Sequence, residues 1–245
     1  MSTEACDSST DPMTALPHTL RYAISDGFRQ AVPIIIGFIP VGFTFGVLAT
    51  KYGLSAFSTI FMSFIVLAGS SQFIAISLFG AAVSPLTIIV TTFIVNLRHL
   101  LMSAAIAKQL RPMSPLKKWL FGFQLIDETF AIHMANIERG TFNHPQAFTI
   151  NCIAHFCWVG GTALGVFGAH LVTDIKPLGF DYALPAMFVA LLIWQLRSNM
   201  HIIVAAISAV MAVILYLLGA QQLCVILAAV IGATAGVFLC NTRRN

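Results

Sequence analysis

The chain has few charged residues. Asp, Glu, Lys and Arg together make up 9% of its 245 residues, against about 25% in an average soluble domain. Hydrophobic residues make up 58%, and the mean hydropathy is +0.88. This composition predicts an integral membrane protein. Because the basic residues flank apolar stretches and form no single patch, the net charge of +4 does not indicate a nucleic acid partner.

Motifs for metal binding and common catalysis are also missing. The five cysteines form no CxxC pair, so neither a disulfide framework nor a zinc site is indicated. HExxH, GxSxG and phosphate-binding Walker loops are absent from the sequence. We therefore predict no metal and no other cofactor. The cysteines, expected to be small packing residues, are Cys6, Cys152, Cys157, Cys224 and Cys240.

The N-terminus is the longest polar stretch. Residues 1–27 are rich in Ser, Thr, Asp and Pro, and they lack the apolar run of a signal peptide. We predict a largely disordered tail over 1–27, with at most a short interfacial helix around 20–28. Residues 28–241 are then a single transmembrane domain.

Eight apolar segments follow, most of them near the roughly 20 residues that a membrane helix needs. The predicted fold class is an all-α polytopic membrane protein. The first segment contains Pro33, Pro40 and several glycines, so it is either a kinked span or a broken, re-entrant helix. The segments cover residues 30–50, 57–79, 85–107, 116–137, 148–171, 183–196, 201–219 and 222–240.

Lysine and arginine favour the cytoplasmic side of a membrane, so their positions test the number of crossings. The strongest basic cluster lies between the third and fourth segments, and we place it inside. Eight full crossings would then leave both termini outside, against the same rule. If the first and fifth segments instead enter and leave on one side, six crossings remain. The cytoplasmic residues then include Arg21, Arg29, Lys51, Lys108, Arg111, Lys117, Lys118, Arg197, Arg243 and Arg244, and the outer ones are Arg139 and Lys176.

A short internal similarity supports six crossings. Residues 44–47 of the first segment, Thr-Phe-Gly-Val, resemble residues 163–166 of the fifth, Ala-Leu-Gly-Val. Three crossings between the two stretches would give them opposite orientations. Inverted repeats with interrupted helices that meet near the bilayer midplane are a common plan in secondary transporters. The sequence therefore predicts two broken or re-entrant helices, in the first and fifth segments, within an inverted repeat.

Small and polar residues interrupt the second segment at residues 68–73, Ala-Gly-Ser-Ser-Gln-Phe. Small residues let helices approach closely, and hydroxyl groups can bond to backbone carbonyls, so a helix-packing patch is one interpretation. The other is a tightly packed or unwound turn that presents dipoles to a substrate. Gln72 favours the second, because its amide offers donors and an acceptor away from the ends of the span.

Three strongly polar residues, Asn96, Arg98 and His99, lie within four positions of the third segment. Successive helix residues are about 100° apart, so Asn96 and His99 lie near one face and Arg98 diverges. Arg98 could extend to the cytoplasmic end, pair with an intramembrane carboxylate, or bind a substrate carboxylate through its planar guanidinium group. His99 titrates near neutrality and is either a proton relay or a core histidine with its hydrogen bonds satisfied.

Asp127 and Glu128 lie within the fourth segment. A charged side chain at membrane depth costs at least about 2.5–3.5 kcal/mol and usually faces a bundle interior or a watery path. Adjacent helix positions point in different directions, so one acid can pair with Arg98 while the other faces the pathway. A carboxyl group in such a site can bind and release a proton during transport; the alternative for each acid is a fixed ion pair. Two acids together favour a transporter or channel.

The other histidines and the aromatic residues are weaker candidates. His155 lies in the fifth segment, and His201 follows Arg197 at a predicted segment edge, where an interfacial position is expected. Phe and Trp in lipid mostly pack or anchor at interfaces, so we assign them no role in a site.

Four stretches give the sequence a resemblance to a known family. They are residues 37–46 (GFIPVGFTFG), 68–73 (AGSSQF), 96–103 (NLRHLLMS) and 127–131 (DETFA). In order and spacing they resemble the AzlC family, the large subunit of branched-chain amino-acid exporters. The resemblance covers about residues 25–240 and leaves out the N-terminal tail.

The resemblance implies export of valine, leucine, isoleucine and, as a further candidate, methionine across a bacterial inner membrane. It also implies coupling to the proton gradient and a small AzlD-type membrane subunit as partner, and it leaves homo-oligomers open. Some members of the family are labelled ABC permeases, but nothing here resembles a coupling loop for an ATPase.

Together these features predict a secondary transporter and not an enzyme. Two alternatives stay open: an intramembrane enzyme that uses Asp127, Glu128 and His99 as acid–base groups, and a membrane scaffold for a partner. Residues expected to bind the substrate are Pro40, Gly69, Ser70, Ser71, Gln72 and Asn96. Residues expected in proton coupling or an ion pair are Arg98, His99, Asp127 and Glu128.

Overall fold

The computed structural model describes residues 12–172, 198–219 and 224–242, with a few single positions between 182 and 196. Its elements in these residues are all helices: α1 (Pro12–Lys51), α2 (Ala56–Val66), α3 (Gly69–Gly80), α4 (Pro85–Ile106), α5 (Pro115–Phe123), α6 (Asp127–Glu138), α7 (His144–Gly168), α9 (Asn199–Leu217) and α10 (Cys224–Thr242). Four of them, α1, α4, α7 and α9, are long and apolar enough to cross a membrane. The chain is thus an all-helical multi-pass membrane protein. The predicted sixth segment, 183–196, lies mostly outside the described residues.

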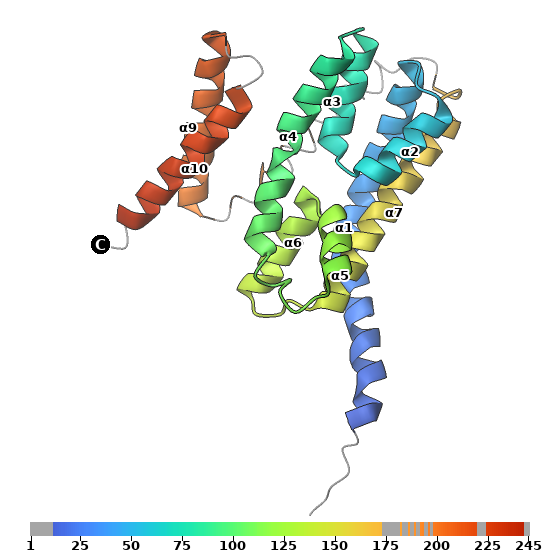
Figure 1. Cartoon of the computed structure of the whole chain (residues 1–245), viewed down its shortest axis with the longest axis vertical. Coiled ribbons are helices and arrows are strands. Elements are labelled where there is room, and N and C mark those ends of the chain that lie inside the picture. Colours follow the sequence, from blue (N-terminus) through green and yellow to red (C-terminus); the bar gives the residue numbers. More distant parts are fainter. Residues whose placement is uncertain are drawn as a thin grey trace, which may run out of the picture.

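Helices α1 and α7 lie side by side, on the side of the fold away from α9 and α10 (Figure 1). Gly27 of α1 lies against Gln146 at the start of α7. Gly46, near the end of α1, lies against Gly165 near the end of α7. The two helices are therefore parallel. Their contact needs glycine, since a Cβ added at Gly46 would lie 2.2 Å from the carbonyl oxygen of Thr162.

The predicted break in the first segment is wrong, because α1 is one helix of 40 residues that includes Pro33 and Pro40. Proline removes a helix hydrogen bond, but membrane helices tolerate it where a neighbouring helix supports the backbone. Here α7 packs along α1, and both prolines lie on the exposed side of α1. Helix α7, which holds the fifth segment, is also unbroken over its 25 residues.

Helix α1 begins inside the polar tail that the sequence predicts to be largely disordered. Residues 12–27 are helical, so the expected short helix around 20–28 is part of a longer one. Packing supports this helix from Ala23 on, because Ala23 and Gly27 are buried where α1 passes the first turns of α7. The turns before Ala23 project beyond the other helices (Figure 1).

The second predicted segment is broken in its middle. Helix α2 leads away from the end of α1, and α3 returns to that end, where Gly80 lies against the ring of Tyr52. The two helices form a V (Figure 1). Leu67 at its point has φ 37° and ψ 45°. This left-handed conformation is rare for a bulky residue and costs about 1–3 kcal/mol.

The fourth predicted segment is broken in the same way, with α5 and α6 as the arms of a second V. Helix α4 leads to the end of the fold where α7 begins, because His144 donates to the carbonyl of Gln109 at 2.9 Å. Helix α6 returns to that end, since Asn136 donates to the side chain of Gln30 at 2.9 Å. The second V therefore enters the fold from the end opposite to the first.

These directions correct the predicted arrangement of repeats. The interrupted segments are the second and fourth, not the first and fifth. The similar stretches 44–47 and 163–166 lie in parallel helices, so they are not related as inverted repeats. The physical reason is that each V returns to the end where it started, which leaves α1, α4 and α7 to run from one end of the fold to the other.

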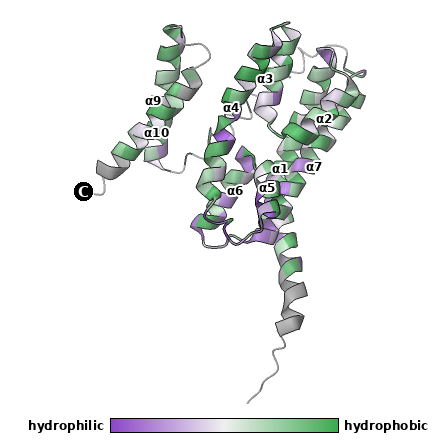
Figure 2. Ribbon diagram, viewed as in Figure 1, coloured by the Kyte–Doolittle hydropathy of each residue, from purple (hydrophilic) through white to green (hydrophobic). Residues whose placement is uncertain are grey.

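Hydrophilic residues gather at one end of the molecule, around the loops after α4 and α6 (Figure 2). We call this the basic end. Arg139 lies there, after α6, whereas Lys51 lies at the opposite end of α1. The six-crossing arrangement placed these two residues the other way round and is wrong for both; Lys176, Arg197, Arg243 and Arg244 lie outside the described residues. The basic residues at the basic end are Arg21, Arg29, Lys108, Arg111, Lys117, Lys118 and Arg139.

Two buried apolar clusters hold these helices together. The first joins the V of α2 and α3 to α1 and α7, and the second joins α4 to the V of α5 and α6 near the basic end. The first includes Phe38, Phe45, Phe73, Ile150 and Trp158. The second includes Met102, Ile106, Phe121, Leu125 and Ala147.

The outward faces of the long helices are apolar. Only 6% of the residues in the span of α4 and 0% of those in the span of α9 are buried, as expected for helices that lipid covers. Helix α10 packs against α9, and the pair stands beside the other helices in Figure 1.

Candidate functional site

The points of the two V-shaped segments meet the middle of α4, and together with α1 and α7 they surround a small cavity. We call it the central cavity. It lies where helix ends, charged groups and apolar side chains come together. Its lining residues are Phe38, Leu67, Ala68, Gly69, Arg98, His99, Ile126, Asp127, Glu128 and Trp158.

Arg98 connects α4 to both broken segments. Its Nη1 lies 2.7 Å from Oδ2 of Asp127 at the start of α6, and its Nη2 donates a hydrogen bond to Oγ of Ser70 in the first turn of α3. Arg98 therefore does not extend to the cytoplasmic end, which was one of its predicted alternatives. The side chains of Arg98 and Asp127 keep 26% and 21% of their exposure, so the pair is half-buried.

The two helix starts give the cavity opposite electrostatic sides. Helix α3 begins with no side-chain cap and no acid in its first turn, so its N–H groups and dipole favour an anion. Helix α6 instead begins with Asp127 and Glu128, which already balance its dipole. The start of α3 and Arg98 are thus the positive side of the cavity, and the two acids are the negative side.

Trp158 of α7 is the main apolar wall. Its side chain is buried, and its indole N–H donates to Oε1 of Gln72 at 2.9 Å. The centroid of its ring lies 5.4 Å from the centroid of the Phe38 ring. A Cβ added at Gly69 would come within 2.9 Å of the indole ring. Glycine at this position therefore lets the start of α3 approach the tryptophan.

Gln72 lies behind this wall, fully buried. Besides accepting from Trp158, it donates through Nε2 to Oγ of Ser63 at 3.1 Å. Ser63 in turn shares a hydrogen bond of 2.8 Å with Thr162. The network ties both arms of the first V to α7, so Gln72 shapes the cavity but does not line it.

The central cavity brings together all four residues predicted for proton coupling or an ion pair: Arg98, His99, Asp127 and Glu128. The predicted pairing of Arg98 with one of the acids occurs with Asp127.

The residues predicted to bind substrate are more scattered. Gly69 lines the cavity. Ser70 does not line it, but its hydroxyl accepts a hydrogen bond from Arg98, which does. Ser71 donates to the carbonyl of Ala68 at 2.9 Å and so stabilises the start of α3. Pro40 is exposed on α1. Asn96 lies beside the cavity, where its backbone carbonyl oxygen is 3.1 Å from Nδ1 of His99.

Sequence reasoning missed the apolar wall, formed by Phe38, Leu67, Ile126 and Trp158. For Trp158 a signal was present, since tryptophan prefers the membrane interface and this one lies in the middle of an apolar segment. Nothing in the sequence marks Leu67 or Ile126. Their positions follow from the breaks in the helices.

The central cavity has a volume of about 20 Å³, close to the space that one water molecule needs. A free amino acid is larger, so the described conformation is closed around the site. Among the described residues, no group of three or more His, Cys, Asp or Glu side chains could hold a metal ion.

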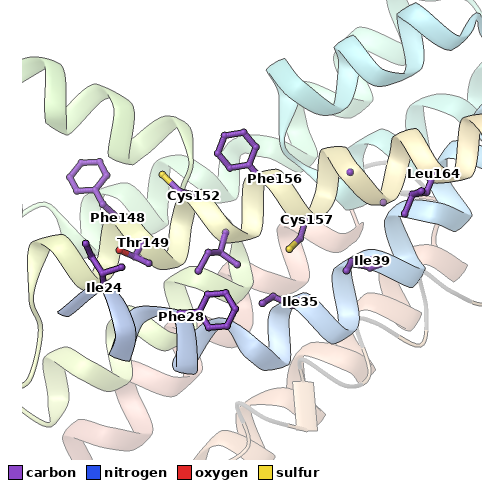
Figure 3. Close-up of a pocket in the computed structure, with 13 residues that line it drawn as sticks. Ile24, Phe28, Ile35, Ile39, Phe148, Thr149, Cys152, Phe156, Cys157 and Leu164 are labelled. Atoms are coloured by element: carbon purple, nitrogen blue, oxygen red, sulfur yellow. The ribbon is translucent and has the colours of Figure 1, made fainter. Parts of the chain in front are cut away.

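A larger depression of about 640 Å³ runs along the outer face of α1 and α7 (Figure 3). Side chains such as Phe28 and Ile39 from α1 and Phe148, Phe156 and Leu164 from α7 line it. It contains no charged side chain. This outer groove therefore suits lipid chains or an apolar helix, and the charged groups of the central cavity are not part of it.

Comparison with known proteins shows to which family the chain belongs. No solved structure matches the chain. The chain is 30% identical over 186 residues to the branched-chain amino acid transport protein AzlC of Bacillus subtilis. The matched residues make up 73% of this chain and 70% of that protein. It is 33% identical over 208 residues to an uncharacterized membrane protein of Archaeoglobus fulgidus, covering 84% and 90% of the two chains. It is 29% identical over 199 residues to the inner membrane protein YgaZ of Escherichia coli, covering 78% and 81%. A family model described as AzlC protein matches residues 33–172, and the chain therefore belongs to the AzlC family.

Proposed function

We propose that this protein is a secondary transporter that exports branched-chain amino acids across the inner membrane in exchange for protons. The observation that carries the proposal is the central cavity, with its positive side, its negative side and an apolar wall between them. The proposed substrates are valine, leucine and isoleucine, with methionine as a further candidate. The names of the relatives from Bacillus subtilis and Escherichia coli support the substrate class and the membrane.

An amino acid with an apolar side chain fits these three features. Its carboxylate would lie at the start of α3 beside Arg98, where helix N–H groups and a guanidinium group favour an anion. Its ammonium group would lie beside Glu128, because Asp127 is already paired with Arg98. Its side chain would lie against Phe38 and Trp158. Each charge of the zwitterion is thereby balanced at membrane depth.

The same arrangement gives Glu128 a role in coupling. As a carboxylate it would hold the ammonium group of the substrate. Once protonated it has no charge to offer, so protonation from outside would release the amino acid. Asp127 is the less suitable carrier, because its charge is balanced by Arg98 at 2.7 Å.

We also propose that the basic end faces the cytoplasm, because lysine and arginine favour that side. Helices α1, α4 and α7 would then cross the membrane, and the two V-shaped segments would be re-entrant from opposite sides. A small AzlD-type membrane subunit is the proposed partner, and a homo-oligomer is compatible with the exposed apolar faces of α4 and α9.

Counterflow in proteoliposomes tests the proposal. Protein purified with and without a co-expressed small subunit would be given labelled leucine, valine, isoleucine, methionine, lysine and glutamate. We expect exchange of the apolar amino acids only, recovered chemically unchanged. Exchange of none of them would contradict the proposal, and a chemically altered product would instead indicate an enzyme.

Two substitutions at the negative side test the proton carrier. We expect Glu128→Gln to abolish export driven by a pH gradient, since an amide does not titrate, and Asp127→Asn to weaken export by leaving Arg98 without its counter-charge. Glu138→Gln, at the exposed end of the same helix, is the matched control and should behave as the wild type. Full proton-driven export by both cavity variants would show that neither acid carries the proton.

A further inference from the structure

A column of buried polar side chains connects the central cavity with the basic end. Its members are side chains of α6 and α7, which meet where His133 bonds to Asn151. On α6 the polar residues are spaced four and then three apart, which places them on one face of the helix. On α7 they lie on the buried face. From the cavity side, the members are Thr129, His133 and Asn136 of α6 and His155, Asn151 and Gln146 of α7.

At the basic end the column begins with an amide network around Asp26. Nε2 of Gln30 donates to Oδ2 of Asp26 at 2.8 Å, and Gln146 donates to the same oxygen. Nδ2 of Asn136 donates to Oε1 of Gln30 at 2.9 Å. Asp26 and Gln30 are partly exposed, so this end of the column opens to water.

Further in, His133 and Asn151 form a hydrogen-bonded pair, and both side chains are fully buried. Nε2 of His133 lies 2.8 Å from Oδ1 of Asn151. An amide oxygen only accepts, so the ring carries its proton on Nε2 and has a lone pair on Nδ1. That Nδ1 and the Nδ2 of Asn151 have no hydrogen-bond partner in the part of the chain that the structure describes.

His155 supplies a third buried polar atom without a hydrogen-bond partner among the described residues, nearer the cavity. This atom is its Nε2, and the residue lies one turn from Trp158 on α7. Buried polar atoms nearly always bond to protein or to ordered water. Three of them along one column therefore indicate a line of positions where water molecules bind.

The distances along α6 suit such a line. Glu128 precedes His133 by five residues, which is about 7.5 Å along the helix and about 140° around it, and Asn136 follows His133 by three, about 4.5 Å along and about 60° around. Water molecules that pass around α6 beside Thr129, and one between His133 and Asn136, would complete a hydrogen-bonded chain. The column spans about half of the roughly 30 Å hydrocarbon core of a bilayer.

We propose that this column is the path of the coupling proton between Glu128 and the basic end, with His133 as its relay. The inference rests on the proposed function, because it requires a proton to be exchanged at the central cavity. The ionisable groups along the column are Asp26 at its outer end and Glu128, Asp127 and His155 at its inner end. The other ring contacts of His133 are with uncharged aromatic side chains, Phe121 and Phe142.

The transfer has two balanced steps. The protonated carboxyl group of Glu128 gives its proton through water to the Nδ1 lone pair of His133, which leaves a carboxylate and an imidazolium. The imidazolium then releases the Nδ1 proton to water beside Asn136 and becomes neutral again. The Nε2–H group keeps its bond to Asn151 throughout, so the ring stays in place.

The test is His133→Gln in proteoliposomes. A glutamine amide can still donate to Asn151, but it cannot carry a proton. We expect counterflow exchange of labelled leucine, which needs no net proton movement, to stay within about two-fold of the wild type. Accumulation driven by a pH gradient, and dye-detected proton flux, should fall by roughly 100-fold, in the range of a lost proton-transfer group.

A matched control is His144→Gln, which removes a histidine that bonds to the carbonyl of Gln109 at the same end but outside the column. It should behave as the wild type in both assays. If His133→Gln does not fold, Asn151→Leu removes the acceptor that holds the His133 ring within the column and should give the same separation of the two assays.

Undiminished proton-driven accumulation by His133→Gln would overturn the inference. An equal loss of exchange and accumulation would also overturn it, because that result indicates a purely structural pair. Failure of the wild-type protein to exchange any amino acid would instead contradict the proposed function itself.

Discussion

At the scale of single residues, Arg98 is the side chain that joins α4 to both V-shaped segments. It contacts Asp127 and Ser70 at once, which a planar guanidinium group can do and a lysine ammonium cannot do in the same geometry. We expect Arg98→Lys to lose one charged hydrogen bond, about 1.5–3 kcal/mol, and so to raise the half-saturating leucine concentration in counterflow by roughly 10–150-fold. Arg111→Lys, on the exposed surface, is the control. An unchanged concentration dependence would mean that Arg98 does not contact substrate.

Trp158 allows a second test at this scale, on substrate size. Trp158→Leu removes much of the apolar wall and leaves Oε1 of Gln72 without its indole donor. We expect transport to shift toward larger side chains, with the ratio of phenylalanine to leucine rising by about 10-fold, since each methylene in an apolar pocket changes selectivity by roughly 10–200-fold. Phe156→Leu, in the outer groove, should leave the ratio unchanged. A constant ratio in both variants would place the substrate side chain away from Trp158.

The charged part of the site could be predicted from the sequence, whereas its apolar part could not. Arg98, Asp127 and Glu128 stand out because a charge within an apolar segment is costly wherever the chain folds. Leucine and isoleucine occur throughout a membrane protein, so Leu67 and Ile126 gain their position only from the turns that break their segments.

At the scale of helices, the glycines of α1 and α7 act in packing. Their role misled the sequence prediction, which took Pro33, Pro40 and the neighbouring glycines as signs of a broken helix. The actual breaks lie in segments 57–79 and 116–137, which are long enough to span and were counted as full crossings. The second segment carries a sequence signal, the small polar run after Ala68, that was weaker than the proline pair. No comparable signal marks residues 124–126, where the fourth segment breaks.

Matched glycine substitutions test the contact between α1 and α7. A Cβ added at Gly165 would lie 2.0 Å from a backbone oxygen of Phe43, whereas one at Gly160 meets nothing within 4 Å. We expect Gly165→Ala to lower the stability of the purified protein by about 1–3 kcal/mol through overpacking. Gly160→Ala should be neutral or stabilising by up to about 1 kcal/mol, because alanine favours helix. Thermal unfolding in detergent measures both, and equal melting temperatures would contradict the close contact.

At the scale of the whole molecule, two V-shaped segments enter from opposite ends and meet at α4, so the central cavity lies between two barriers. The first V is tied to α7 by Gln72, Ser63 and Thr162. The second is tied to α1 by Asn136 and Gln30. With both connections made, the cavity holds about one water molecule. Opening one connection at a time would expose the site to one side of the membrane, as alternating access requires.

This architecture predicts on which side of the membrane each loop lies. Because α1 runs through the fold from the basic end, Lys51 must lie on the side opposite to Arg139, and both are exposed. With the basic end in the cytoplasm, a membrane-impermeant maleimide should label Lys51→Cys in intact cells of a cysteine-free variant. Arg139→Cys should be labelled only after the membrane is opened, and Lys117→Cys, also at the basic end, serves as its matched control. The reverse pattern would invert the orientation but keep the fold. Labelling of positions 51 and 139 from the same side would contradict the end-to-end path of α1, and with it the conclusion that the second and fourth segments, and not the first and fifth, turn back inside the membrane.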